Sequence, residues 1–128
     1  MSYYFAKTVE TGFDNAVSRA RDALRGEGFG VISDIDVGRI LRSKLGVDFR
    51  PYVILGACDP VLAHGALALE DKIGTLLPCN VIVQEFAPGL CEVAAVDPVA
   101  AMRATENPAL LDTAKAVASR LQAAINAV

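Results

Sequence analysis

Two apolar runs that flank a single strongly signalled helix constrain the fold of this chain more than any other feature. The runs cover Val53–Ala57 and Asn80–Phe86 and have the length and composition of β-strands. Between them, Asp59 is a preferred N-cap residue and Pro60 suits the first helical position, so we expect a helix over residues 60–73. A strand, a helix and a second strand in succession indicate that the chain combines both kinds of secondary structure around one core.

The remainder of the chain predicts three more strands and four further helices. The strands are expected at residues 3–9, 29–35 and 90–96, and the helices at residues 12–25, 36–45, 98–102 and 108–128. Pro88-Gly89 is a turn signal that joins the last two strands as a hairpin. We therefore predict a single α+β domain over residues 1–128, with about five mostly antiparallel strands packed with helices in the order β-α-β-(α)-β-α-β-β-α.

Composition and charge exclude several classes of protein. Hydrophobic residues make up 53% of the chain and charged residues 21%, which is not the composition of a disordered segment. No apolar run approaches the ~18–20 residues needed to span a bilayer, and the N-terminus lacks the basic and apolar regions of a secretory signal. We therefore expect a cytoplasmic protein outside the membrane. The net charge of −3 argues against a nucleic-acid partner, which would favour a basic face.

Two short motifs resemble a known family. Gly56-Ala57-Cys58-Asp59-Pro60 ends the third predicted strand, and Leu77-Pro78-Cys79-Asn80-Val81 opens the fourth. Together with Gly28-Phe29-Gly30, Asp97-Pro98 and Asn107-Pro108, they resemble the bacterial and archaeal family known as domain of unknown function 302. The resemblance implies an α+β fold like that of the TATA-box-binding protein, which is a similarity of architecture and implies no DNA binding. Because the family has no established activity, the resemblance implies a fold and leaves the function open.

One residue departs from the family pattern. Members often have Asn where this chain has Asp59. Both residue types accept hydrogen bonds from the first backbone N–H groups of a helix, so we expect the same local structure.

The cysteines at the two ends of the predicted helix are the main candidates for a site. Cys58 ends a strand just before a helix N-terminus, where the helix dipole favours a thiolate and the carboxylate of Asp59 opposes it. Cys79 follows a proline and precedes Asn80, whose side chain can hydrogen-bond the neighbouring main chain. Glu70 lies at the edge of the apolar stripe, where partial burial would raise its pKa. The candidate ligand-binding residues are therefore Cys58, Asp59, Glu70, Cys79 and Asn80, and the sequence identifies no catalytic residue, metal-ligand set or cofactor.

We expect Cys58 and Cys79 to lie at opposite ends of the sheet. A strand–helix–strand passage normally returns the chain to its starting end before the next strand begins. A strand of about six residues, rising ~3.3 Å per residue, would then separate the two cysteines by about 20 Å. A disulfide requires Cα atoms within ~7 Å, so this arrangement excludes one. The argument for this separation weakens if residues 73–77 run back along the sheet.

These features leave two functions open. The first is a non-enzymatic domain that binds a small ligand or a protein partner in a groove between the helix over residues 60–73 and the sheet. The second is a thiol-dependent protein that handles sulfur, a redox reaction or a soft metal through Cys79, with or without Cys58. The first is favoured because no nearby His or Lys is evident to activate Cys79, and the only histidine, His64, projects away from the apolar stripe. Motifs for nucleotide binding and serine hydrolysis are absent, so the sequence favours a protein that is not an enzyme.

Apolar residues occupy both faces of the predicted strands. Leu55 points one way while Ile54 points the other, whereas a sheet with one solvated face should alternate apolar with polar residues. If the helices over residues 12–25 and 108–128 pack on one face, the other face stays open unless the helix over residues 60–73 covers it. We therefore predict a homodimer that buries the sheet or its edge.

Overall fold

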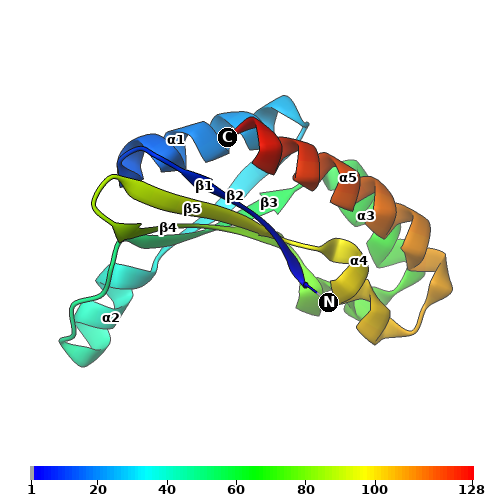
Figure 1. Ribbon diagram of the computed structural model, residues 1–128. Helices are drawn as coiled ribbons and strands as arrows, with labels where there is room; N and C mark the ends of the chain where they lie inside the picture. Colours follow the sequence, from blue (N-terminus) through cyan, green and yellow to red (C-terminus); the bar gives the residue numbers. More distant parts are fainter. Residues whose placement is uncertain (1) are drawn as a thin grey trace.

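The chain folds into one antiparallel sheet of five strands in the order β1-β5-β4-β3-β2 (Figure 1). The computed structural model describes residues 2–128. The strands are β1 (Tyr4–Val9), β2 (Gly30–Asp36), β3 (Tyr52–Cys58), β4 (Cys79–Ala87) and β5 (Leu90–Val96). The helices are α1 (Phe13–Gly26), α2 (Val37–Leu45), α3 (Pro60–Leu69), α4 (Pro98–Met102) and α5 (Leu111–Ala127), with short 3-10 helices η1 (Asp71–Leu76), η2 (Arg103–Thr105) and η3 (Pro108–Leu110). The predicted α+β class and the predicted order of elements are confirmed.

One face of the sheet, which we call the core face, packs against three helices. α1, α3 and α5 all lie on this side of the strands (Figure 1). Because side chains alternate along a strand, the paired residues Leu55 and Val81 both point toward the helices and are fully buried. Leu121 and Ile125 of α5 are buried against the same layer. The hydrophobic core therefore lies between the sheet and a single layer of helices.

No helix within residues 2–128 packs across the opposite face of the sheet, which we call the bare face (Figure 1). The strand register aligns one apolar residue from each strand into a continuous row, namely Ala6, Ala94, Ile82, Ile54 and Ile35. The side chains of these five residues are all exposed or half-buried in the described structure. The open second face that the sequence predicts is present, and α3 does not cover it because α3 packs on the core face.

The helix predicted over residues 60–73 is shorter than expected. α3 ends at Leu69, and Glu70 has an extended backbone with φ −148° and ψ 105° before η1 begins. As a result, Leu69 is 49% exposed whereas Ile73 is buried in η1, although the predicted stripe included both. The change of direction at Glu70 lets the chain return to the end of the sheet that it had left, where β4 begins.

The helices are short. The longest, α5, has 17 residues and mixes buried apolar positions with exposed polar ones. Within residues 2–128, no helix combines the length and the apolar character that a membrane-spanning segment requires.

Candidate functional site

The two motifs at the ends of β3 and β4 lie side by side. The strands pair antiparallel, with Gly56 opposite Asn80 and Ala57 opposite Cys79. Cys58 and Cys79 are therefore neighbours at one end of the sheet, and the expected separation of about 20 Å is wrong. The physical reason is that β3 and β4 are antiparallel neighbours. The connection through α3 and η1 therefore leaves and rejoins the sheet at the same end, and its last residues return along α3 to the start of β4.

Gly56 permits this close approach. A Cβ atom at Gly56 would lie 2.7 Å from Cγ of Pro78 and would also collide with Oγ of Ser33. A serine hydroxyl can rotate away, but the proline ring is rigid and cannot. The absence of a side chain at Gly56 therefore allows Pro78, whose peptide bond with Leu77 is cis, to pack on β3 beside Cys79.

A cavity of about 50 Å³ lies where the two motifs meet the helices. The sheet end supplies both Cys58 and Cys79 to its wall, and most other lining side chains are apolar. They are Phe29, Ala57, Asp59, Leu62, Ala63, Ala66, Leu77, Pro78, Pro98, Met102, Leu110, Thr113, Ala114 and Val117. The volume exceeds the ~10–15 Å³ that one water molecule needs and is well below the ~150 Å³ of a cavity that accepts benzene. The space therefore suits a molecule of a few heavy atoms or the end of an apolar chain.

Asp59 joins α3 to α5 beside this cavity. Its Oδ1 accepts hydrogen bonds from the backbone N–H groups of Val61 and Leu62, at 3.0 and 3.2 Å, as an N-cap does. Its Oδ2 accepts a hydrogen bond from Nη1 of Arg120 at 2.8 Å, so the two side chains form an ion pair. The hydrogen bond from Arg120, followed by that from Leu62, lowers the pKa of the Asp59 carboxyl below its usual value. Asp59 is therefore ionised at neutral pH.

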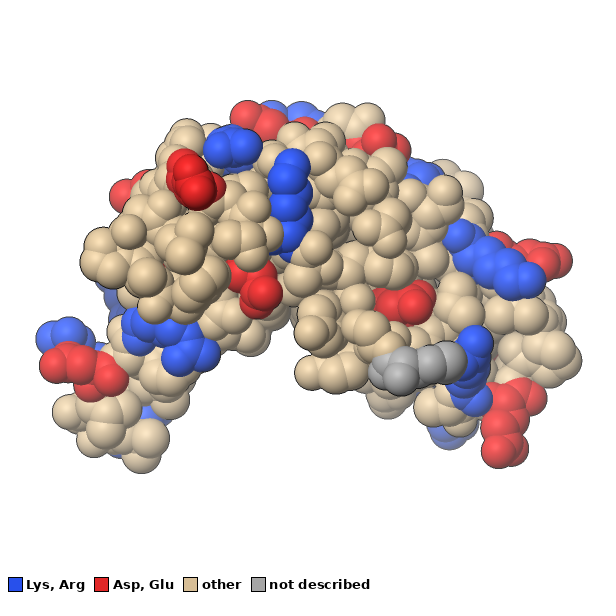
Figure 2. All heavy atoms as spheres, in the orientation of Figure 1, with Lys and Arg blue, Asp and Glu red and all other residues tan. Residues whose placement is uncertain are grey.

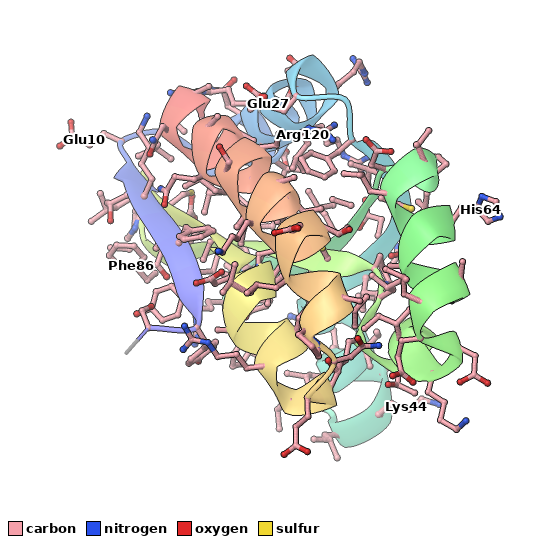
Figure 3. All side chains as sticks on the ribbon, turned by 90° about the vertical axis from the view of Figure 1, so that its right-hand side faces the viewer. Glu10, Glu27, Lys44, His64, Phe86 and Arg120 are labelled. Atoms are coloured by element: carbon pink, nitrogen blue, oxygen red, sulfur yellow. The ribbon has the colours of Figure 1, made fainter. Side chains whose placement is uncertain are left out.

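Arg120 also ties α5 to the end of α1, where Figure 3 shows it beside Glu27. Its Nε donates to the backbone carbonyl of Glu27 at 2.9 Å, and its Nη2 donates to the same oxygen. The guanidinium carbon lies 4.7 Å from the centre of the Phe29 ring, within reach of a cation–π interaction. Gly28, at φ 86°, leaves room for the guanidinium, because a Cβ there would lie 2.5 Å from Nη2. Sequence reasoning missed Arg120, although a cation three residues after Val117 on the apolar side of the last helix was an available signal.

Burial controls the state of the Cys79 thiol. The pKa of Cys79 is raised to about 11, first by burial and second by the charge of the neighbouring Cys58. At neutral pH, Cys79 is therefore a protonated thiol. Cys58 is half-buried and lines the same cavity. The third cysteine, Cys91, is buried at the other end of the sheet, where its Sγ donates to the backbone carbonyl of Thr11 at 3.3 Å.

The structure separates two of the predicted site residues from the cavity. Asn80 lies exposed on the bare face, and Glu70 is half-buried in the irregular turn between α3 and η1. The other three, Cys58, Asp59 and Cys79, gather at the cavity. His64 points outward from α3 (Figure 3). Among the described residues, no group of three or more His, Cys, Asp or Glu side chains is placed to hold a metal ion.

We predict that Asp59→Asn destabilises the protein by about 1–2 kcal/mol at neutral pH, because Asn retains the helix cap and loses the charge-assisted bond to Arg120. The pKa of Asp59 is lower in the folded protein than the ~3.9 of an unfolded chain, so its contribution is complete above that pH. The contribution is lost as the pH falls through the folded-state pKa. Urea unfolding of both proteins should show the difference in free energy shrinking in acid.

Asp36→Asn is the matched control for this measurement. Asp36 caps α2 by accepting a hydrogen bond from the backbone N–H of Arg39 at 2.9 Å, and it is exposed. We expect this variant to differ little from the wild type at any pH. A difference between wild type and Asp59→Asn that stays constant down to strong acid would contradict the role assigned to the ion pair.

We also predict that Cys79 reacts with a thiol reagent more slowly than a reference peptide thiol, because a pKa of about 11 leaves roughly a hundredfold less thiolate. Cys58 should react before Cys79, since it is only half-buried. Timed labelling of native protein with peptide mapping measures both rates, and labelling after denaturation is the control. Faster reaction of Cys79 than of the reference thiol would overturn the prediction.

Comparisons with known proteins place the chain in a family. The family model described as Domain of unknown function DUF302 matches residues 5–128. The crystal structure of an uncharacterized conserved DUF302 protein from Bacillus stearothermophilus superposes with a TM-score of 0.90 at 30% sequence identity, covering 98% of each chain. None of the curated proteins matches the sequence. On the matched length and the close structural similarity, the chain belongs to the family described as Domain of unknown function DUF302.

Proposed function

We propose that the chain binds a small, mainly apolar molecule in the cavity between α3, α5 and the ends of β3 and β4. The observation that carries the proposal is the cavity itself, which is lined mainly by apolar side chains and a few polar groups. This combination is typical of sites that bind small molecules, where apolar contacts supply affinity and a few polar groups orient the ligand. The thiols of Cys58 and Cys79 are the polar groups best placed to orient it.

The charges around the cavity favour a neutral ligand. Asp59 is the only charged residue among its described lining residues, and its carboxylate already accepts hydrogen bonds from the backbone N–H groups of Val61 and Leu62 and from Arg120. A cation would have to compete with Arg120 for that carboxylate. An anion would meet the carboxylate of Asp59 and an otherwise mainly apolar lining, and both disfavour negative charge.

Filling the cavity with a side chain should abolish binding. Dissolved xenon is the probe, because it is small and apolar enough for the space. We expect saturable changes in the amide NMR signals around Ala66 and Val117 in the wild type, and their loss in Ala63→Leu. Ala68→Leu, on the exposed side of the same helix, is the matched control and should respond as the wild type does. Unchanged signals in the wild type, or a normal response of Ala63→Leu, would refute binding in this cavity.

Thiol chemistry is the second candidate function, and one observation favours it. Cys58 and Cys79 both line the cavity, so a sulfur atom or a soft metal ion held there would meet two thiols. The raised pKa of Cys79 opposes this function, because metal binding and nucleophilic attack both require the thiolate. The labelling rates described above discriminate between the two functions, since only thiol chemistry requires a reactive Cys79.

We infer in addition that the chain acts as a homodimer. The total accessible surface is 7261 Å², whereas compact monomers of 13.5 kDa expose about 6,500 Å². The chain therefore exposes about 750 Å² more surface than a compact monomer of its mass. The apolar row on the bare face supplies the kind of surface that a dimer interface covers.

Light scattering coupled to size exclusion tests the dimer. We expect a dimer mass at micromolar concentration and a monomer mass for Ile82→Asp, which would place a charge at the centre of the apolar row. Val61→Asp, at a position of α3 that is 80% exposed, is the control and should remain dimeric. A wild-type mass that stays monomeric as the concentration rises would remove the homodimer.

A further inference from the structure

We infer that residues 37–50, which we call the arm, dock onto the bare face of a second copy of this chain. The arm consists of α2 and the segment that leads from it to β3. The inference rests on the homodimer proposed above and specifies which two surfaces form its interface.

The helix of the arm, α2, is regular but has no buried residue. α2 has nine residues, begins at the Asp36 cap and ends at Gly46, whose backbone is left-handed at φ 66°. Helices shorter than ~12–15 residues are marginal in water unless they pack against other structure. A short helix with this little internal packing therefore needs a surface that a single chain does not provide.

The arm also carries apolar side chains that face solvent. Ile40 is 45% exposed and Leu45 is 68% exposed on α2, and the following segment adds Val47 at 43% and Phe49 at 40%. Scattered apolar residues are ordinary on a protein surface, but four exposed ones within a single short segment are a local concentration of apolar surface. The arm thus presents the apolar surface that a docking helix requires.

The bare face offers a matching hollow. Figure 1 shows α2 projecting from one end of the sheet, and Figure 2 shows the space that this leaves beneath the strands. Part of that space is a depression of about 400 Å³, with Tyr52, Ile82 and Val96 among its lining residues. Because the arm projects away from its own sheet, it leaves this depression open to another molecule.

Charge favours the arm of a second copy as the occupant. The arm carries Arg39, Arg42, Lys44 and Arg50 against a single acidic residue, Asp48, which forms an ion pair with Arg42, so the arm is positively charged overall. Among the described lining residues of the depression, Glu92 is the only charged one. A partner's arm would bring positive charge toward that carboxylate, so the two surfaces are complementary in sign as well as in apolar character.

Twofold symmetry lets both arms dock at once. An isologous interface pairs surface A of one protomer with surface B of the other, and the reverse pair follows from the same axis. With the arm at one end of the bare face, two chains facing each other in opposite directions place each arm over the other's hollow. Both apolar surfaces are then covered without a third chain.

Cysteine cross-linking tests this pairing in the full-length protein. Leu45→Cys and Ile82→Cys are made separately, mixed, left to exchange subunits and then oxidised. We expect a disulfide-linked dimer from the mixture, and from a chain that carries both substitutions, but only background from each single variant. Wild-type protein under the same oxidation measures the contribution of the native cysteines, and circular dichroism checks that each variant is folded.

The results of the cross-linking experiment distinguish docking of the arm from dimer formation in general. Cross-linking of Ile82→Cys alone would mean that two bare faces stack directly, and cross-linking of Leu45→Cys alone would mean that α2 pairs with α2. Either result, or a dimer without any cross-link, overturns arm docking and leaves the homodimer standing. A monomer mass by light scattering overturns both inferences together.

Discussion

The antiparallel pairing of β3 with β4 is the constraint on which the rest of the structure depends. It places Ala57 opposite Cys79, so the two family motifs meet and one end of the sheet becomes a wall of the cavity. It also requires the connection through α3 and η1 to begin and end at the same end of the sheet. That connection packs on the core face with α1 and α5, and within residues 2–128 neither α2 nor α4 packs across the bare face. The cavity therefore follows from this pairing, which also places α3 on the side away from the bare face.

The ion pair between Asp59 and Arg120 organises the helices around this sheet. Asp59 caps α3 with one oxygen and binds Arg120 with the other, while Arg120 holds the carbonyl of Glu27 at the end of α1. Three helices are thus joined through one guanidinium beside the cavity. The side chain of Asp59 is 16% exposed and that of Arg120 is 29% exposed, so the pair keeps part of its hydration. The desolvation of the intact pair offsets much of its attraction, so its main role is to orient the helices, whereas removing one partner costs stability because the other loses its charged partner.

Local sequence signals predicted the strands and helices well, but they predicted poorly which residues from distant parts of the chain come into contact. Periodicity and caps identified every strand and the start of α3 at Asp59 and Pro60, because these depend on neighbours in the chain. The break at Glu70 was missed, since the apolar stripe continues through Ile73 without a proline or glycine to stop the helix. Because this break was not predicted, Cys58 and Cys79 were expected at opposite ends of the sheet, whereas they lie at the same end. Arg120 was missed for a related reason, because its partners lie 61 and 93 residues away in the chain.

Alternation along β4 explains why one motif serves two different surfaces. Cys79 points into the cavity on the core side, and the next residue, Asn80, points to the bare face. Burial gives the first a protonated thiol among apolar neighbours, while the second is an exposed amide in a shallow depression. A ligand small enough for the cavity cannot touch both. The segment Pro78-Cys79-Asn80 therefore contributes to two separate surfaces, the wall of the cavity through Pro78 and Cys79 and the bare face through Asn80.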